Sequence, residues 1–254
     1  MRAIWTGSIS FGLVNIPVKM YSGSRSHHGL DLNMLHEKDH ERIRYARICR
    51  KDGKEVPYDE IVKGYEYQEG DFIILTDDDF KKADAKKTQS LEIKQFVDET
   101  EIDSRYFDKP YYLEPDKKAD RAYALLRDAL KESGKVALCK FAMRTRDYMG
   151  AIKTIGNALV LNQMRFPSDV REFGDLKLPA KNIASEGEMD MAMQLIKQQA
   201  HHFIPEDWHD EYTEELEEII EAKAHGQRPK AHGKAPEETK VQDLMATLKA
   251  SLGQ

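Results

Sequence analysis

The sequence predicts an α+β fold dominated by β-strands and followed by a helical C-terminal arm. Three observations support this prediction. Alternating apolar and polar residues, typical of half-buried strands, recur through the first 184 residues. One amphipathic helix interrupts these strands over residues 116–133. After Ser185 the spacing of apolar residues changes to the three-and-four pattern of helices.

The first strand is predicted over residues 3–14. Its apolar residues share one parity, with Gly7 among them and serine or threonine opposite: Trp5, Ile9, Phe11 and Leu13. Pro17 begins a second extended run that reaches Tyr21. Residues 42–50 form a further strand-like run. The Asp52-Gly53 dipeptide that follows is typical of a hairpin turn.

The next elements follow the same logic. Residues 71–76 are apolar and prone to form a strand. The acidic triplet at 77–79 suits the N-terminus of a short helix, because carboxylates stabilise the positive end of the helix dipole. Residues 91–97 and 110–113 are further predicted strands.

The helix predicted over residues 116–133 has one apolar face and is ended by Gly134. That face consists of Ala122, Leu125, Leu126, Ala129 and Leu130. Strands are predicted over 135–143 and 151–164. The turn between them contains Arg144, Arg146 and Asp147.

The last quarter of the chain is predicted to be helical. Ser185 and Glu188 form a capping box, the signature of a helix N-terminus. The helix that follows repeats apolar residues to Phe203 and ends before Pro205, and a second helix has Tyr212, Leu216, Ile219 and Ile220 on one face. We therefore expect a core over 1–184, a helical arm over 185–224, a flexible linker over 225–238 and a terminal helix over 239–254.

The terminal helix has a narrow apolar stripe. Its members recur at helical spacing and are Val241, Leu244, Met245, Leu248 and Leu252. A helix this short is marginal alone in water, so the stripe docks either on this chain or on a partner. We favour a partner and call these five residues the terminal stripe.

The charge of the chain is distributed unevenly. The net charge is −6, which taken alone argues against a nucleic-acid-binding protein. Residues 1–65 and 117–182 are nevertheless basic, with balances of +3 and +7, whereas 66–116 and 183–254 have −8 each. A fold that places the basic segments on one surface has a basic patch despite its acidic total.

The sequence indicates a reduced, cytoplasmic protein. No apolar run reaches the length that a membrane span needs, and no signal peptide is visible. The two cysteines cannot form a disulfide framework. Cys139 is expected in the core. Cys49 lacks a Cys-x-x-Cys partner, because position 52 is aspartate.

No catalytic motif is convincing, so we expect neither enzymatic activity nor a cofactor. The phosphate-binding glycine loops and the G-x-S-x-G elbow are missing. The segment from His36 through Glu37 to His40 matches H-E-x-x-H, which makes a zinc peptidase the alternative hypothesis, with Glu60 as a third ligand. The charged pair between the histidines and the lack of a surrounding amphipathic helix favour a chance match, so we expect no metal.

The basic residues are the better candidates for function. In the 42–50 run Arg42, Arg44 and Arg50 share one parity, and Arg47 has the other. The second basic group is Lys140, Arg144, Arg146 and Lys153. Such residues suit contacts to DNA phosphates that do not depend on base sequence, and no recognition helix is evident. We expect two or three of these eight residues to form internal salt bridges instead.

Several segments resemble bacterial Ku proteins, in order along nearly the whole chain. They include the opening MRAIWTGSISFGLVNIPVKMY, then 42–45, 53–56, 63–66, 112–115, 137–141, 203–205, 210–212, 220–223 and 243–245.

The resemblance implies a Ku-type β-barrel core and a bridge hairpin, which we place at about 36–60. It further implies a homodimeric ring around broken ends of double-stranded DNA, associated with the nucleoid, that recruits the ATP-dependent ligase D for non-homologous end joining. We therefore assign the arginine hairpin to the bridge, the Arg144–Arg146 turn to the DNA channel and the terminal stripe to the ligase.

Overall fold

The computed structural model describes residues 1–25, 29–84, 89–143, 146–181 and 183–227, together with Leu248 and Ser251. The chain divides into two compact units. The first comprises Met1–His28 and Asn33–Glu172, and the second comprises Gly29–Leu32 and Phe173–Gln254.

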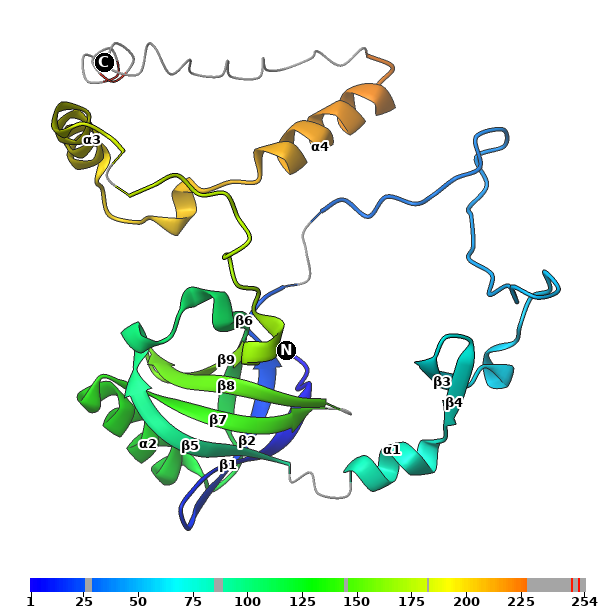
Figure 1. The fold of residues 1–254 in the computed structure, drawn as a ribbon, viewed down its shortest axis with the longest axis horizontal. Coiled ribbons are helices and arrows are strands. Elements are labelled where there is room, and N and C mark those ends of the chain that lie inside the picture. Colours follow the sequence, from blue (N-terminus) through cyan, green and yellow to red (C-terminus); the bar gives the residue numbers. More distant parts are fainter. Residues whose placement is uncertain are drawn as a thin grey trace. The chain divides into compact units, whose positions relative to one another are not determined.

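The first unit contains a closed seven-stranded barrel (Figure 1). Around the barrel the strands are β1 (Trp5–Phe11), β2 (Val14–Ser22), β6 (Phe107–Pro115), β9 (Ala158–Met164), β8 (Arg146–Ile155), β7 (Lys135–Met143) and β5 (Ser90–Asp98). All neighbours are antiparallel except β1 and β5, whose parallel pairing closes the barrel. The prediction of a β-dominated α+β fold with a barrel core is confirmed.

Alternate residues of the strands fill the barrel. The largest fully buried side chains are Ile9, Ile16, Met20, Leu91, Ile152, Leu159, Leu161 and Val18. The helix α2 (Asp120–Ser133) adds Tyr123, Leu126 and Leu130 to the same core. Cys139 also lies in this core, as expected, and burial raises the pKa of its thiol to about 12.

Tyr123 ties α2 to two strands. Its hydroxyl donates to the carbonyl oxygen of Leu113 in β6 and accepts from the amide of Leu159 in β9, each at 2.7 Å. Burial raises the pKa of this phenol. Tyr123 therefore satisfies backbone groups of two buried residues, Leu113 and Leu159.

The variant Tyr123→Phe is expected to lower the free energy of unfolding by about 1–3 kcal/mol, because it leaves a buried amide and a buried carbonyl unpaired. Urea denaturation measures the change. Tyr112→Phe is the matched control, since Tyr112 is 42% exposed. Equal stability of the two variants would show that the Tyr123 hydroxyl does not hold α2 to the barrel.

Several predicted elements had wrong limits, among them the first helix of the arm, which was predicted to reach Phe203 and ends at Gln199. The strand over 3–14 divides at Gly12 and Leu13, because Gly12 has φ +57° and Leu13 is fully exposed in the turn. The strand over 151–164 divides in the same way at Gly156, whose φ is +58°. The helix predicted from residue 116 begins at Asp120, after a turn in which Ala119 N–H donates to the Asp116 carbonyl. It ends as predicted, with Gly134 in the left-handed conformation.

Residues 33–84 of the first unit contain only small elements. These are the 3-10 helix η1 (Tyr58–Glu60), the strands β3 (Lys63–Gln68) and β4 (Asp71–Leu75), and the helix α1 (Asp77–Asp84). In the part of the chain that the structure describes, these two strands pair only with each other. The predicted strand at 71–76 and the helix after it are both present, whereas β3 was not predicted. At the start of α1, Asp79 accepts from the Thr76 hydroxyl at 2.6 Å and from the Thr76 amide at 2.9 Å, and these hydrogen bonds lower the pKa of its carboxyl.

The second unit contains the helices α3 (Glu186–Gln199) and α4 (Glu211–Ala224). The Ser185–Glu188 capping box is present as predicted. Asp210 begins α4 by accepting from the amide of Thr213 at 3.1 Å. The predicted linker beyond Gln227 and most of the predicted terminal helix lie outside the described residues. Leu248 and Ser251 are the exceptions, and both are helical.

Candidate nucleic-acid interface

The arginine-rich segment forms two successive hairpins. In the first, His36 N–H donates to the Glu41 carbonyl at 2.8 Å and Ile43 N–H to the Met34 carbonyl at 2.9 Å. In the second, Cys49 N–H donates to Lys54 at 2.9 Å and Val56 N–H to Arg47 at 2.7 Å. We call residues 34–56 the double hairpin.

The continuous strand predicted over 42–50 is therefore wrong. Residue 42 closes the first hairpin through a single bridge to Leu35, whereas Ile48 forms a single bridge to Glu55 in the second. The physical reason is the lack of a packed face, because Ile43 and Ile48 are each about half exposed and none of the described strands pairs with this segment. The turn predicted at Asp52-Gly53 is present, with Gly53 at φ +71°.

The four arginines of the double hairpin are all exposed. Arg44 lies 3.8 Å from the Glu55 carboxylate, and the guanidinium of Arg47 lies over the Tyr58 ring, 5.0 Å from its centroid. Arg42 and Arg50 form no ion pair with the residues that the structure describes. These two charges are therefore available to a phosphate backbone.

The second predicted group is spread over the barrel. Arg146 and Asp147 belong to β8, opposite Met143 and Ala142, so the prediction that they lie in the turn is wrong. The antiparallel pairing of β7 and β8 continues to their ends, which extends the strand by several residues. Arg144 lies outside the described residues.

Lys140, Arg146 and Lys153 are not brought together. Arg146 and Lys153 stand at opposite ends of β8 and on opposite faces, because seven residues separate them along a strand. The ammonium of Lys153 is hydrogen-bonded to the Glu99 carboxylate in the 3-10 helix η2 (Glu99–Glu101). Lys140 is exposed on the outer face of β7.

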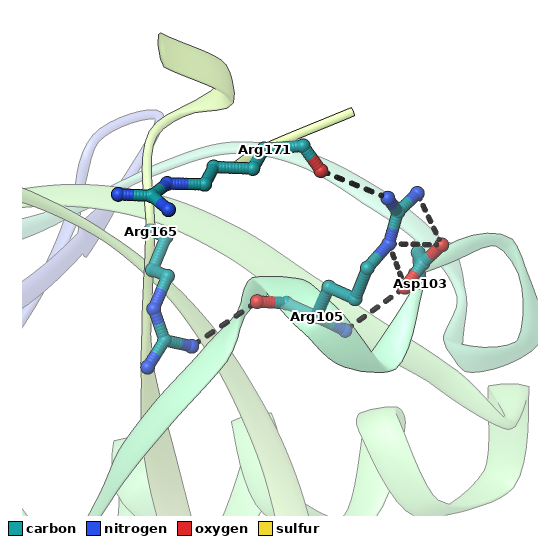
Figure 2. Close-up of polar contacts among 4 residues, drawn as sticks. All are labelled: Asp103, Arg105, Arg165 and Arg171. Atoms are coloured by element: carbon teal, nitrogen blue, oxygen red, sulfur yellow. Dashed lines mark hydrogen bonds and ion pairs between the residues drawn. The ribbon is translucent and has the colours of Figure 1, made fainter. Parts of the chain in front are cut away.

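Three arginines that the sequence did not single out meet where β6 begins and β9 ends (Figure 2). Arg105 Nη2 donates to Asp103 at 2.9 Å, and its Nη1 donates to the carbonyl oxygen of Arg171 at 3.4 Å. Arg165 Nη1 donates to the carbonyl oxygen of Arg105 at 3.1 Å. The hydrogen bond from Arg105 holds the pKa of Asp103 below its usual range.

This cluster is structural in character. Arg165 also pairs with Asp108 at 3.2 Å, so the guanidinium groups of Arg105 and Arg165 are both committed to carboxylates and carbonyls of the chain. Only the Asp-x-Arg spacing at 103–105 hinted at it in the sequence, whereas the contacts to Arg165 and Arg171 join segments about sixty residues apart.

The H-E-x-x-H segment is a turn and not a helix. His40 N–H donates to the His36 carbonyl at 2.8 Å, and His40 has a left-handed φ of +57°. His36 Nδ1 lies 2.8 Å from Asp39 Oδ1. Among the described residues no group of three histidine, cysteine or acidic side chains could hold a metal. The geometry that a zinc peptidase requires, two histidines on consecutive turns of a helix, is not formed.

Comparison of the sequence with known protein families also indicates a β-barrel domain. The family model of the Ku70/Ku80 beta-barrel domain matches residues 10–191. The chain belongs to the Ku family. The matched range contains every strand of the barrel except the first residues of β1, and it also contains the double hairpin. The Ku resemblance inferred from the sequence is thus confirmed.

Several Ku relatives match along most of their length. A protein of Opitutus terrae is 44% identical over 258 residues, covering 100% of this chain and 92% of that relative. Proteins of Cupriavidus necator and Desulfitobacterium hafniense are 40% and 39% identical and cover 100% and 99% of this chain, with 78% and 87% of each relative matched. All three are named non-homologous end joining protein Ku.

Within the described ranges, no helix is both long and apolar enough to span a membrane.

Proposed function

We propose that this Ku-family chain binds the ends of double-stranded DNA, without sequence preference, in non-homologous end joining. The double hairpin is the observation that most supports this proposal. It presents exposed arginines on a backbone with no core of its own, as a surface that follows phosphates would. The names of the relatives supply the pathway. The chain acts as a scaffold and not as an enzyme.

A homodimer explains the exposed apolar side chains that flank the arginines. In residues 33–84 the exposed large apolar residues include Tyr45, Tyr58, Tyr65, Phe72, Ile73 and Ile74. A two-stranded sheet with such a surface is marginally stable in water unless something covers it. A second copy offers the same surfaces with two-fold symmetry, and two such bridges close a ring around the duplex.

A gel-shift comparison tests the ring. Linear duplex is expected to bind, and covalently closed circles of the same sequence and mass are expected to bind weakly, because a closed ring loads only at an end. Binding should weaken steeply with salt, since phosphate neutralisation releases counterions. Equal binding to both DNAs would contradict end loading but leave phosphate binding intact.

The terminal stripe is proposed to recruit the ATP-dependent ligase D. Deletion of residues 239–254 is expected to leave DNA affinity unchanged and to abolish stimulation of end ligation by that ligase. Substitution of Leu244 and Leu248 by aspartate should reproduce the loss, since it removes the apolar face and leaves the length unchanged. If the truncated protein still stimulates ligation, the ligase binds elsewhere on the chain.

A further inference from the structure

One guanidinium of the arginine cluster beside β6 and β9 is not used by the chain. The guanidinium groups of Arg105 and Arg165 are both paired with carboxylates. Arg171 contributes its backbone carbonyl oxygen to the cluster, whereas its exposed side chain forms no hydrogen bond or ion pair with the residues that the structure describes. Figure 2 shows this side chain extending away from Arg105 and Asp103. The cluster therefore presents one guanidinium that is available to a ligand.

Arg171 is oriented through Arg105. It follows the 3-10 helix η4 (Pro167–Asp169), beyond the residues of β9 that pair with β6. The Arg105 guanidinium that donates to its carbonyl oxygen is itself fixed at two points, because Nε and Nη2 donate to the Asp103 carboxylate at 3.1 and 2.9 Å. At 3.4 Å the bond to Arg171 is long, so its loss should shift Arg171 without unfolding the barrel.

The strand directions place Arg171 at one particular end of the barrel. β2 ends where β1 begins, since Trp5 pairs with Met20. β6 is antiparallel to β2 and so begins at this end, and β9 ends there, since Phe107 pairs with Met164. β5 runs parallel to β1 and also begins there. The segment with the double hairpin leaves the barrel after β2 and returns at β5. Arg171 and this segment are therefore attached to the same end, which we call the attachment end.

A phosphate is the ligand that fits a free arginine at the attachment end. A guanidinium binds phosphate oxygens through two parallel N–H bonds and keeps its charge at any physiological pH. Arg146, one of the predicted DNA contacts, is the exposed first residue of β8, and β8 begins where β9 ends. Two exposed arginines of the barrel thus lie at the end from which the double hairpin extends.

We propose that Arg171 binds a phosphate of the DNA duplex and that the Asp103–Arg105 pair positions it for this contact. The inference rests on the proposed function, because it takes duplex DNA as the ligand. It adds a contact on the barrel to those of the double hairpin. Arg105 is a positioning residue, which acts through Arg171 and does not touch the DNA.

The affinity of the full chain for a fluorescent linear duplex, measured by anisotropy across a salt series, tests the contact. Arg171→Ala is expected to lower the affinity about threefold to tenfold and the slope of log affinity against log salt by about one. Arg171→Lys should keep the slope, because it keeps the charge. Arg121→Ala is the matched control and should change neither quantity, since Arg121 is also exposed but lies in the first turn of α2, which follows β6 at the opposite end of the barrel.

A double-mutant cycle tests the positioning role. Arg105→Gln is expected to lower the affinity about threefold in the unaltered protein and to have no further effect in Arg171→Ala, because its effect passes through Arg171. An equal loss in both backgrounds would overturn the positioning role.

Two further outcomes separate this inference from the proposed function. If the unaltered protein binds linear duplex and Arg171→Ala behaves like Arg121→Ala, the phosphate contact is refuted and the proposed function stands. If the unaltered protein does not bind linear duplex, both are refuted.

Discussion

Charge reversal of Arg42 and Arg50 together is expected to lower the affinity for linear duplex DNA by about tenfold to a hundredfold at physiological salt. These are the two arginines of the double hairpin that have no ion pair in the described part of the chain. The slope of log affinity against log salt should fall by about two, one for each lost phosphate contact. Fluorescence anisotropy across a salt series measures both quantities.

The controls separate local from general electrostatics. Arg121→Glu with Lys131→Glu makes the same change in net charge on the exposed side of α2 and should leave the slope unchanged. Arg44→Glu should have a smaller effect than Arg42→Glu, because Arg44 already interacts with Glu55. If the Arg42/Arg50 variant and the Arg121/Lys131 variant lose the same affinity for DNA, the double hairpin does not contact DNA.

The barrel could be predicted from sequence because each of its strands has one face in a common core. Ile9, Met20 and Leu91 alternate with polar or partly exposed residues, and the core that they fill is a single cluster. Two predicted strands were too long because each contains a short turn that the sequence pattern did not reveal. Gly12 and Gly156 permit a left-handed backbone, and a two-residue turn interrupts alternation too little to be visible in a run of apolar residues.

The same signal failed over residues 42–50 for the opposite reason. The pattern there comes from three arginines of one parity, Arg42, Arg44 and Arg50, and not from a buried face, since Cys49 is the one residue of this run that is not exposed. Without a face to bury, the chain forms two open hairpins held by a few backbone hydrogen bonds. A periodic pattern predicts a strand only where something covers its apolar side.

The candidate site was predictable in composition but not in arrangement. The arginines were identified, yet the pairing of Lys153 with Glu99 joins positions 54 residues apart. Arg105, Arg165 and Arg171 meet only because β6 and β9 are neighbours in the barrel. Strand order determines such contacts, and the spacing of residues along the sequence does not contain it.

The uneven distribution of charge suggests different binding partners for the basic and the acidic segments. The basic segment 1–65 contains the double hairpin, whereas the segment 183–254, with a balance of −8, contains α3 and α4. Acidic helices are repelled by phosphates. Their exposed apolar residues therefore suit contact between protein subunits, which makes α3 a test of the proposed dimer.

Substitution of Met193 and Ile196 by aspartate is expected to dissociate the dimer, with a loss in dimer affinity of at least about a hundredfold, because two apolar anchors become charged. Together with Met189, they form an exposed apolar line along α3, at 45%, 62% and 53% exposure. The fold should survive, since neither residue is buried. Light scattering gives the mass, and anisotropy gives the affinity for DNA ends.

Glutamines on the same helix provide the matched control. Gln194→Asp with Gln198→Asp adds the same charge to α3 at exposed polar positions and should leave both the mass and the affinity unchanged. If the variant with aspartate at Met193 and Ile196 remains dimeric, α3 is excluded from the subunit contact. A monomeric variant that keeps full affinity for ends would be more informative, because it would refute the ring while retaining the arginine contacts. Loss of both properties together is what a ring requires, since neither bridge can enclose the duplex without the other.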